Sequence, residues 1–204
     1  YIEKYGKSVL GTNCERFENF PVLIKLIDAR DNLSVQVHPD NEYALRVEGE
    51  YGKTEMWYIV DCEEDASLLY GFKKEISKEE FSQRIKNNTL LEVTNSVKVK
   101  KGDIFFIEAG TLHAIGGGIL LAEVQQNCNT TYRVYDYGRL VDGKPRELHI
   151  EKALDVTNTL PPVRSAEAEG KEEVIGDAIV QKLCSCEFFT MTSLKLNGKY
   201  EYNC

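Results

Sequence analysis

Short apolar segments separated by polar turns recur along the chain, and many of them alternate between apolar and polar residues. Alternation with a period of two is typical of β-strands that bury one face. The segments that predict strands are 20–28, 33–38, 55–61, 66–72, 97–100, 103–108, 119–125, 131–135 and 187–196. Turns follow one another at spacings of roughly 8 to 12 residues, and helices do not alternate with the strands. This pattern favours a mainly β sandwich, barrel or jelly roll over a Rossmann or TIM-barrel architecture.

Helical patterns are confined to short segments. Residues 77–87 predict the clearest helix, because Ser77 can cap its start and Glu80 follows at the spacing of a capping box. Residues 149–156 predict a second short helix, whereas 42–50 predict either a short helix or a loop.

The charge balance excludes some classes of partner. Asp and Glu number 33 against 25 Lys and Arg, which gives a net charge of −8. A nucleic-acid partner needs a basic face, so we expect none, although a small anionic ligand needs only a few local cations. Hydrophobic residues make up 42% of the chain. That share is ordinary for a soluble globular protein, and no apolar run approaches a membrane span.

The six cysteines are irregularly spaced and form no Cys-x-x-Cys pair. A disulfide scaffold does not suit a chain of this length and apolar content. We therefore predict reduced thiols and a cytoplasmic location, and no secretory signal pattern opens the chain. The cysteines are Cys14, Cys62, Cys128, Cys184, Cys186 and Cys204.

The three histidines offer the most informative chemistry. His38 and His113 stand at strand ends beside turns, whereas His149 stands at the start of the second predicted helix and suits capping or packing. Gln36 lies two residues before His38, so both point to one face of a strand. Glu55 opens the next strand and could lie beside them. Taken singly, each histidine also suits a structural role, but together these residues predict a site with N and O ligands for zinc or another transition metal.

The segment GDIFFIEAGTLH resembles the second half of the cupin motif, G-x5-P-x-G-x2-H. Gly102, Gly110 and His113 match it, whereas Glu108 stands where the motif has Pro. Three further motifs precede this segment and one follows it. In chain order they are LSVQVHPDN, GKTEMWYIVD and YGFK before it, and VQQNCNTTYRVYDYGR after it. Together they closely resemble type I mannose-6-phosphate isomerases, in their short bacterial form. The resemblance is continuous over about residues 20–160.

This resemblance implies a mainly β fold, a cupin-type jelly-roll barrel with a short helical insertion and the start of a second β-domain. Residues 1–160 would form the catalytic domain, and residues 161–204 a linker and the beginning of the second domain. The resemblance also implies that both ends are truncated relative to the family. We expect unpaired sheet edges to leave such a fragment poorly stable, which a cooperative thermal melt at moderate temperature would contradict.

The resemblance also implies an activity: interconversion of mannose 6-phosphate and fructose 6-phosphate through an enediol(ate), with one Zn2+ per chain. The small sugar phosphate would be the partner, with no nucleic acid and no membrane. By motif, the metal ligands fall on Gln36, His38, Glu55 and His113. The resemblance also assigns Arg133, Lys53 and Glu123 to catalysis, and Ser34 and Lys73 to phosphate binding.

Several alternatives remain open from sequence. The general base could be Lys53, Glu123 or a zinc-bound water. Gln36 could be a polar neighbour rather than a ligand, Lys73 a solvated surface charge, Glu123 a solvent-facing residue and Arg133 half of a surface ion pair. At the level of function, the alternatives are a non-catalytic sugar-phosphate-binding cupin and, with two histidines and one carboxylate, a non-haem Fe(II) cupin oxygenase.

Overall fold

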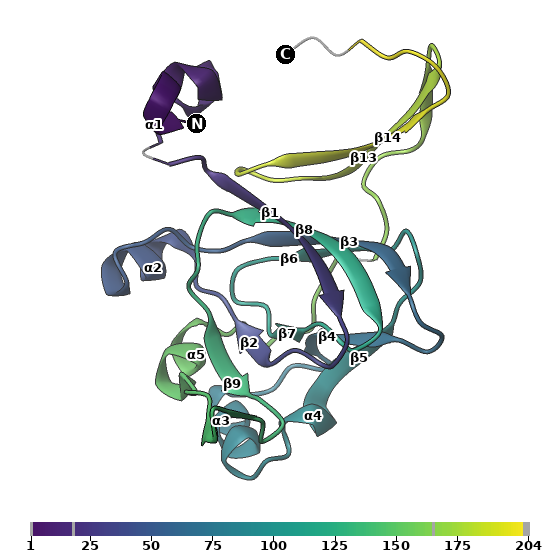
Figure 1. Cartoon of the computed structure of the whole chain (residues 1–204). Helices are drawn as coiled ribbons and strands as arrows, with labels where there is room; N and C mark the ends of the chain where they lie inside the picture. The colour runs from purple at the N-terminus through teal and green to yellow at the C-terminus, as the bar shows by residue number, and fades with distance from the viewer. Residues whose placement is uncertain (1, 18, 165, 202–204) are drawn as a thin grey trace.

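Two antiparallel sheets form the centre of the computed structural model, which describes residues 2–17, 19–164 and 166–201 (Figure 1). The first sheet has the order β1–β8–β3–β6, with bounds Val22–Ala29, Ile119–Gln126, Glu55–Cys62 and Ile104–Ile107. The second has the order β5–β4–β7–β2–β9, with bounds Thr94–Lys98, Ser67–Phe72, His113–Ala114, Val35–Val37 and Tyr132–Tyr135. The chain crosses repeatedly from one sheet to the other, as in a jelly roll.

The main core lies between these two sheets, because the inward residues of their strands are mostly apolar. The first sheet contributes Trp57 and Leu121, and the second contributes Leu68 and Tyr70, among other buried residues. Alternate residues on β3 point the other way, so Met56 belongs to a separate cluster on the outer face. The predicted mainly β jelly roll is therefore confirmed.

Helices cover the outer face of the second sheet. The helices α3 (Lys78–Lys86), α4 (Leu90–Val93) and α5 (Ile150–Val156) pack there against side chains of β2, β4, β7 and β9. The helix α2 (Asn41–Val47) settles the ambiguity over 42–50, and the Asp40 side chain caps it by accepting from the Tyr43 amide. Ser77 caps α3 as predicted, but the Glu80 carboxylate bonds Arg84 instead of completing a capping box.

A third sheet packs on the outer face of the first. It consists of β12 (Glu173–Ile175), β13 (Ala178–Ser185) and β14 (Thr190–Leu196), of which only β14 was predicted. Leu183 and Cys184 contact Met56 and Phe106 across this junction. The division of the chain after residue 160 stays a prediction.

The remaining elements are short. They are α1 (Ile2–Tyr5), 3-10 helices at Lys7–Leu10 and Thr12–Cys14, and the ribbon of β10 (Leu140–Val141) and β11 (Lys144–Pro145). In the part of the chain that the structure describes, no helix has the length and apolar character needed to cross a membrane.

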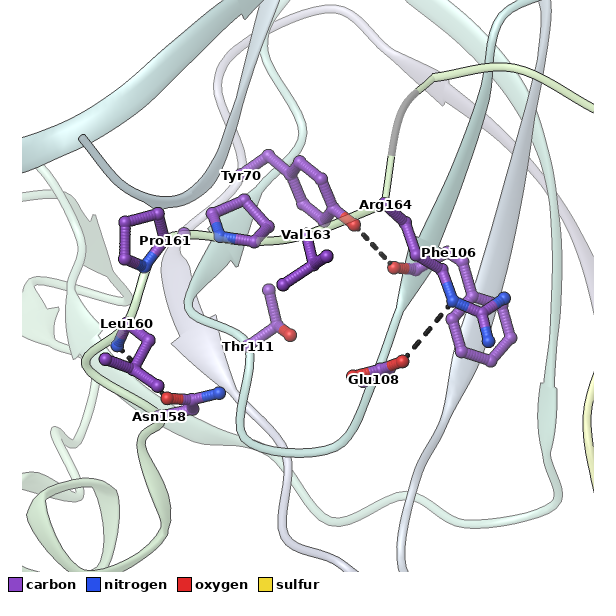
Figure 2. A pocket seen from close by; sticks show the side chains of 11 residues that line it. Tyr70, Phe106, Glu108, Thr111, Asn158, Leu160, Pro161, Val163 and Arg164 are labelled. Atoms are coloured by element: carbon purple, nitrogen blue, oxygen red, sulfur yellow. Dashed lines mark hydrogen bonds and ion pairs between the residues drawn. The ribbon is translucent and has the colours of Figure 1, made fainter. Parts of the chain in front are cut away.

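The predicted linker packs closely against the second sheet and the loop that leads to β7 (Figure 2). Just before it, the Asn158 amide donates to the Gly110 carbonyl over 2.8 Å, and within it Arg164 stacks on Phe106 with 4.0 Å between the guanidinium carbon and the ring centroid. A β-carbon on Gly71 would lie 2.7 Å from Pro162, which leaves no room for a larger residue. These contacts enclose a cavity of only about 60 Å³, too small for a sugar phosphate.

Candidate metal centre and active site

His38, Glu55 and His113 converge between the two main sheets. His38 follows β2, Glu55 opens β3 and His113 opens β7, so both sheets contribute. His38 Nε2 lies 3.3 Å from Glu55 Oε1, and His113 Nε2 lies 3.8 Å from Glu55 Oε2. All three side chains are at most 1% exposed. Their ligand atoms lie within 4.8 Å of one another, so the sequence-predicted cluster is brought together.

Backbone carbonyls orient both imidazole rings. His38 Nδ1 lies 3.0 Å from the Thr130 carbonyl oxygen, and His113 Nδ1 lies 2.8 Å from that of Thr111. A carbonyl only accepts, so each Nδ1 carries the proton and each Nε2 presents a lone pair toward Glu55. This arrangement is the one that metal-binding histidines commonly adopt.

The facing lone pairs call for a cation between them. Among the described residues, His38 Nε2 and both Glu55 oxygens are buried without a hydrogen-bond partner. Burial lowers the pKa of His38 to about 4, so a proton does not occupy this position at neutral pH. Burial also lowers the pKa of His113. The pKa of Glu55, which burial alone would raise, is lowered by its interactions with His38, His113 and the Lys53 ammonium, so Glu55 is a carboxylate.

The donor set fits zinc. Two ligands of a tetrahedral zinc with bonds of about 2.1 Å lie about 3.4 Å apart. The separations within the cluster, 3.3 and 3.8 Å, are close to that value. Gln36 also borders the cluster, since its Nε2 lies 3.4 Å from His113 Nε2. Rotating its amide by 180° would present Oε1, the atom that can bind a metal.

Lys53 and Glu123 are both buried near this cluster, with 5% and 4% of their surfaces exposed. Lys53 Nζ lies 3.2 Å from Glu55 Oε1. Glu123 lies opposite Trp57 in the first sheet, where its Oε2 accepts from the indole over 3.0 Å. Its Oε1 lies 2.8 Å from Lys25 Nζ. Glu123 therefore does not face solvent.

Ser34 and Arg133 form a second group, beside Gln36. Arg133 is the cross-strand partner of Gln36, and its Nε donates to Ser34 Oγ over 3.3 Å. Ser34 Oγ in turn donates to Gln36 Oε1 over 3.4 Å. Asp136 does not pair with Arg133 but binds Arg139 and Arg146 instead.

Two other residues singled out in the sequence lie elsewhere. Lys73 is exposed at the end of β4, where its ammonium donates to the Glu92 carbonyl over 2.9 Å. No contact within the described ranges connects Lys73 with the cluster. His149 stands at the N-cap position of α5, but its Nδ1 accepts from the Arg133 amide over 3.3 Å and its ring packs on Tyr132.

Sequence reasoning missed Lys25, Gln125 and the guanidiniums beside Arg133. Lys25 is the single cation within the apolar run FPVLIKLID, and it falls on the inward face of β1 opposite Glu123. Its place in an otherwise apolar strand could have marked Lys25 as a site residue. Gln125 is fully buried opposite Glu55 and donates to the carbonyls of Gln126 and Cys128.

Comparisons with known proteins agree with this geometry. Residues 3–64 match the model of the phosphomannose isomerase type I catalytic domain. The probable mannose-6-phosphate isomerase GmuF of Bacillus subtilis is 46% identical over 182 residues, covering 88% of this chain and 57% of that protein. The chain is homologous to the type I phosphomannose isomerases. It spans little more than half the length of the curated relatives it matches.

Solved structures of such isomerases have the same fold as this chain. A crystal structure of the mannose 6-phosphate isomerase from Bacillus subtilis superposes with a TM-score of 0.88 at 36% identity, covering 97% of this chain and 62% of that one. A zinc-bound mannose 6-phosphate isomerase is only 16% identical, with a TM-score of 0.65 over 94% of this chain and 67% of its own, and shows the fold alone.

Proposed function

We propose that this chain carries the active site of a zinc-dependent aldose–ketose isomerase that interconverts mannose 6-phosphate and fructose 6-phosphate. The observation that carries the proposal is the buried cluster of His38, Glu55 and His113, whose lone pairs face one another. Its setting in a homologue of type I phosphomannose isomerases supplies the substrate class. The five cysteines in the described part of the chain are free thiols, which supports a cytoplasmic location.

One zinc ion per chain would be held by Gln36 Oε1, His38 Nε2, a Glu55 oxygen and His113 Nε2. Bound there, it would supply a Lewis acid for negative charge on the oxygens at C1 and C2 of the sugar. Glu55 is the one anionic ligand in this set, so little of the metal's charge is neutralised. The Thr130 and Thr111 carbonyls keep the proton of each imidazole on Nδ1 and orient both rings, and burial favours their neutral form.

Isomerisation moves a proton between C2 and C1 through an enediol(ate), so a base must lie within reach of both carbons. Lys53 and Glu123 are the protein groups that we propose for this step, and Lys25 joins them because it pairs with Glu123. A zinc-bound water is the remaining alternative. Loss of the base abolishes turnover while zinc stays bound, so Lys53→Met and Glu123→Gln identify the group that carries the proton.

Ser34 and Arg133 are proposed to bind the phosphate, with Arg139 and Arg146 beside them. Burial lowers the pKa of Arg133, and the like charges of Arg146 and Arg139 lower it further. An anion bound there would relieve this repulsion and gain charge-assisted hydrogen bonds from planar guanidiniums. Gripping the phosphate at this point would fix the position of the reacting carbons.

A coupled assay for fructose 6-phosphate tests the proposal. The chain is stripped of metal, assayed with mannose 6-phosphate, and assayed again after zinc or Fe(II) is added. We expect zinc to restore turnover, and His113→Ala to lower kcat/KM by at least about 100-fold, because removing even the support of a metal ligand has effects of that size. His149→Ala, which removes a histidine outside the cluster, should leave zinc binding unchanged. Zinc binding without turnover would favour a sugar-phosphate-binding module, and a requirement for Fe(II) and oxygen would favour an oxygenase.

A further inference from the structure

Trp57 is the only tryptophan of the chain, and its side chain touches two groups of the site at once. Its indole N–H donates to Glu123 Oε2 over 3.0 Å. Its ring centroid lies 5.3 Å from that of His113, with the planes at 76°. An edge-to-face contact of this kind favours one orientation of each ring.

The surroundings of Trp57 make these two contacts rigid. Trp57 has no exposed surface and is packed in the main core, and Glu123 is only 4% exposed. Water therefore has no easy access to replace the indole N–H at the carboxylate. The other partner of Glu123, Lys25, is 36% exposed and reaches it through a flexible stem. Of the two donors, the indole is the one that fixes the carboxylate in a single orientation.

We propose that Trp57 is a positioning residue for the reaction, which holds the Glu123 carboxylate and limits rotation of the His113 ring. The proposal rests on the function proposed above, because it assigns Glu123 and His113 to the reaction. Trp57 itself supplies no proton and no metal ligand. Its effect on catalysis passes through Glu123, and its effect on metal binding passes through His113.

Trp57→Phe separates the two contacts, because Phe keeps an aromatic ring against His113 but removes the N–H. A hydrogen bond to a charged group is worth enough to change a rate about tenfold. We expect kcat to fall about tenfold while KM and zinc affinity stay within about threefold.

If Trp57 acts through Glu123, the losses from Trp57→Phe and Glu123→Ala will not multiply in the double variant. A wild-type kcat in Trp57→Phe, or losses that multiply, would overturn the proposal. A role in stability alone would lower the melting temperature without changing kcat.

Fluorescence tests the same contacts without requiring turnover. All indole emission of the chain comes from Trp57. In metal-free protein we expect Glu123→Ala to shift this emission, and Glu64→Ala, which removes an exposed turn carboxylate, to leave it unchanged. Zinc added to the wild-type chain should change the emission with an end point at one equivalent. Unchanged emission in Glu123→Ala would contradict the positioning role. If Glu123→Ala shifts the emission but the wild-type chain does not turn over mannose 6-phosphate, the contact between Trp57 and Glu123 is supported and the proposed function is contradicted.

Discussion

At the residue scale, most of the predicted grouping of site residues followed from strand periodicity. The spacing of Gln36 and His38 predicts that both side chains point to one face of a strand, and the structure brings Glu55 and His113 to them. Periodicity could not reveal which ring nitrogen faces the cluster, because that depends on the carbonyls of Thr130 and Thr111 in irregular loops. The roles of these residues as metal ligands remain the proposal.

The lowered pKa of His38 predicts how the metal-free chain responds to pH. Burial lowers this pKa from 6.5 to about 4, so the unfolded chain binds a proton in that interval while the folded chain does not. Stability is therefore complete above pH 6.5 and falls as the pH drops toward 4, by about 3 kcal/mol at most. Denaturant unfolding of metal-free protein at a series of pH values measures this slope. His38→Gln should flatten it, and an equal slope in both proteins would contradict the assignment.

For phosphate binding, the structure favours Arg133 over Lys73, the cation that the sequence resemblance implied, and the two lead to different predictions. Arg133 bonds Ser34 beside the cluster, whereas the Lys73 ammonium is occupied by the Glu92 carbonyl at the surface. Arg133→Gln should lower kcat/KM for mannose 6-phosphate by about 10- to 100-fold, since it removes charged hydrogen bonds. Lys73→Ala, the matched removal of a cation, should change it by less than about twofold. A larger loss in Lys73→Ala than in Arg133→Gln would reverse the assignment.

At the element scale, the strands of the two main sheets other than the two-residue β7 follow from local alternation, and their predicted ends differ from the observed ones by only a few residues. Among the strands that were not predicted, β13 is the longest and shows where local reasoning fails. Its segment AIVQKLCS places Gln181 and Lys182 among apolar residues, and its buried partners Met56 and Phe106 lie far away in sequence. A strand stabilised by such distant contacts leaves little local signal.

The approach of β7 to β4 gives an element-scale prediction. A β-carbon on Gly116, just after β7, would lie 1.8 Å from the Ser67 carbonyl oxygen at the start of β4. Gly116→Ala must push the two strands apart and should lower the free energy of unfolding by about 3 kcal/mol. Gly102→Ala is the control, because Gly102 has a φ of +92° but nothing within 4 Å of the added carbon. That variant should cost only about 1 kcal/mol of backbone strain, and equal losses in chemical denaturation would contradict the close approach.

At the scale of the whole molecule, three layers of packing support one buried cluster. Helices close the outer face of the second sheet, the third sheet covers part of the first, and Arg164 of the linker pairs with Glu108 in the loop between β6 and β7 (Figures 1 and 2). That loop is joined to the cluster on both sides, because Gly110 donates to the His38 carbonyl and Thr111 accepts from His113. Composition and patterning could predict the sheets but not this linker packing, which depends on Pro162 meeting Gly71.

We propose that a single zinc ion in this cluster makes the chain an isomerase. The most direct measurement is a titration of metal-stripped chain with zinc, in which bound metal and turnover of mannose 6-phosphate are followed together. We predict that turnover rises in proportion to bound zinc and levels off at one equivalent, and that both are lost in His113→Ala. Zinc bound at one equivalent with no fructose 6-phosphate formed would contradict the account.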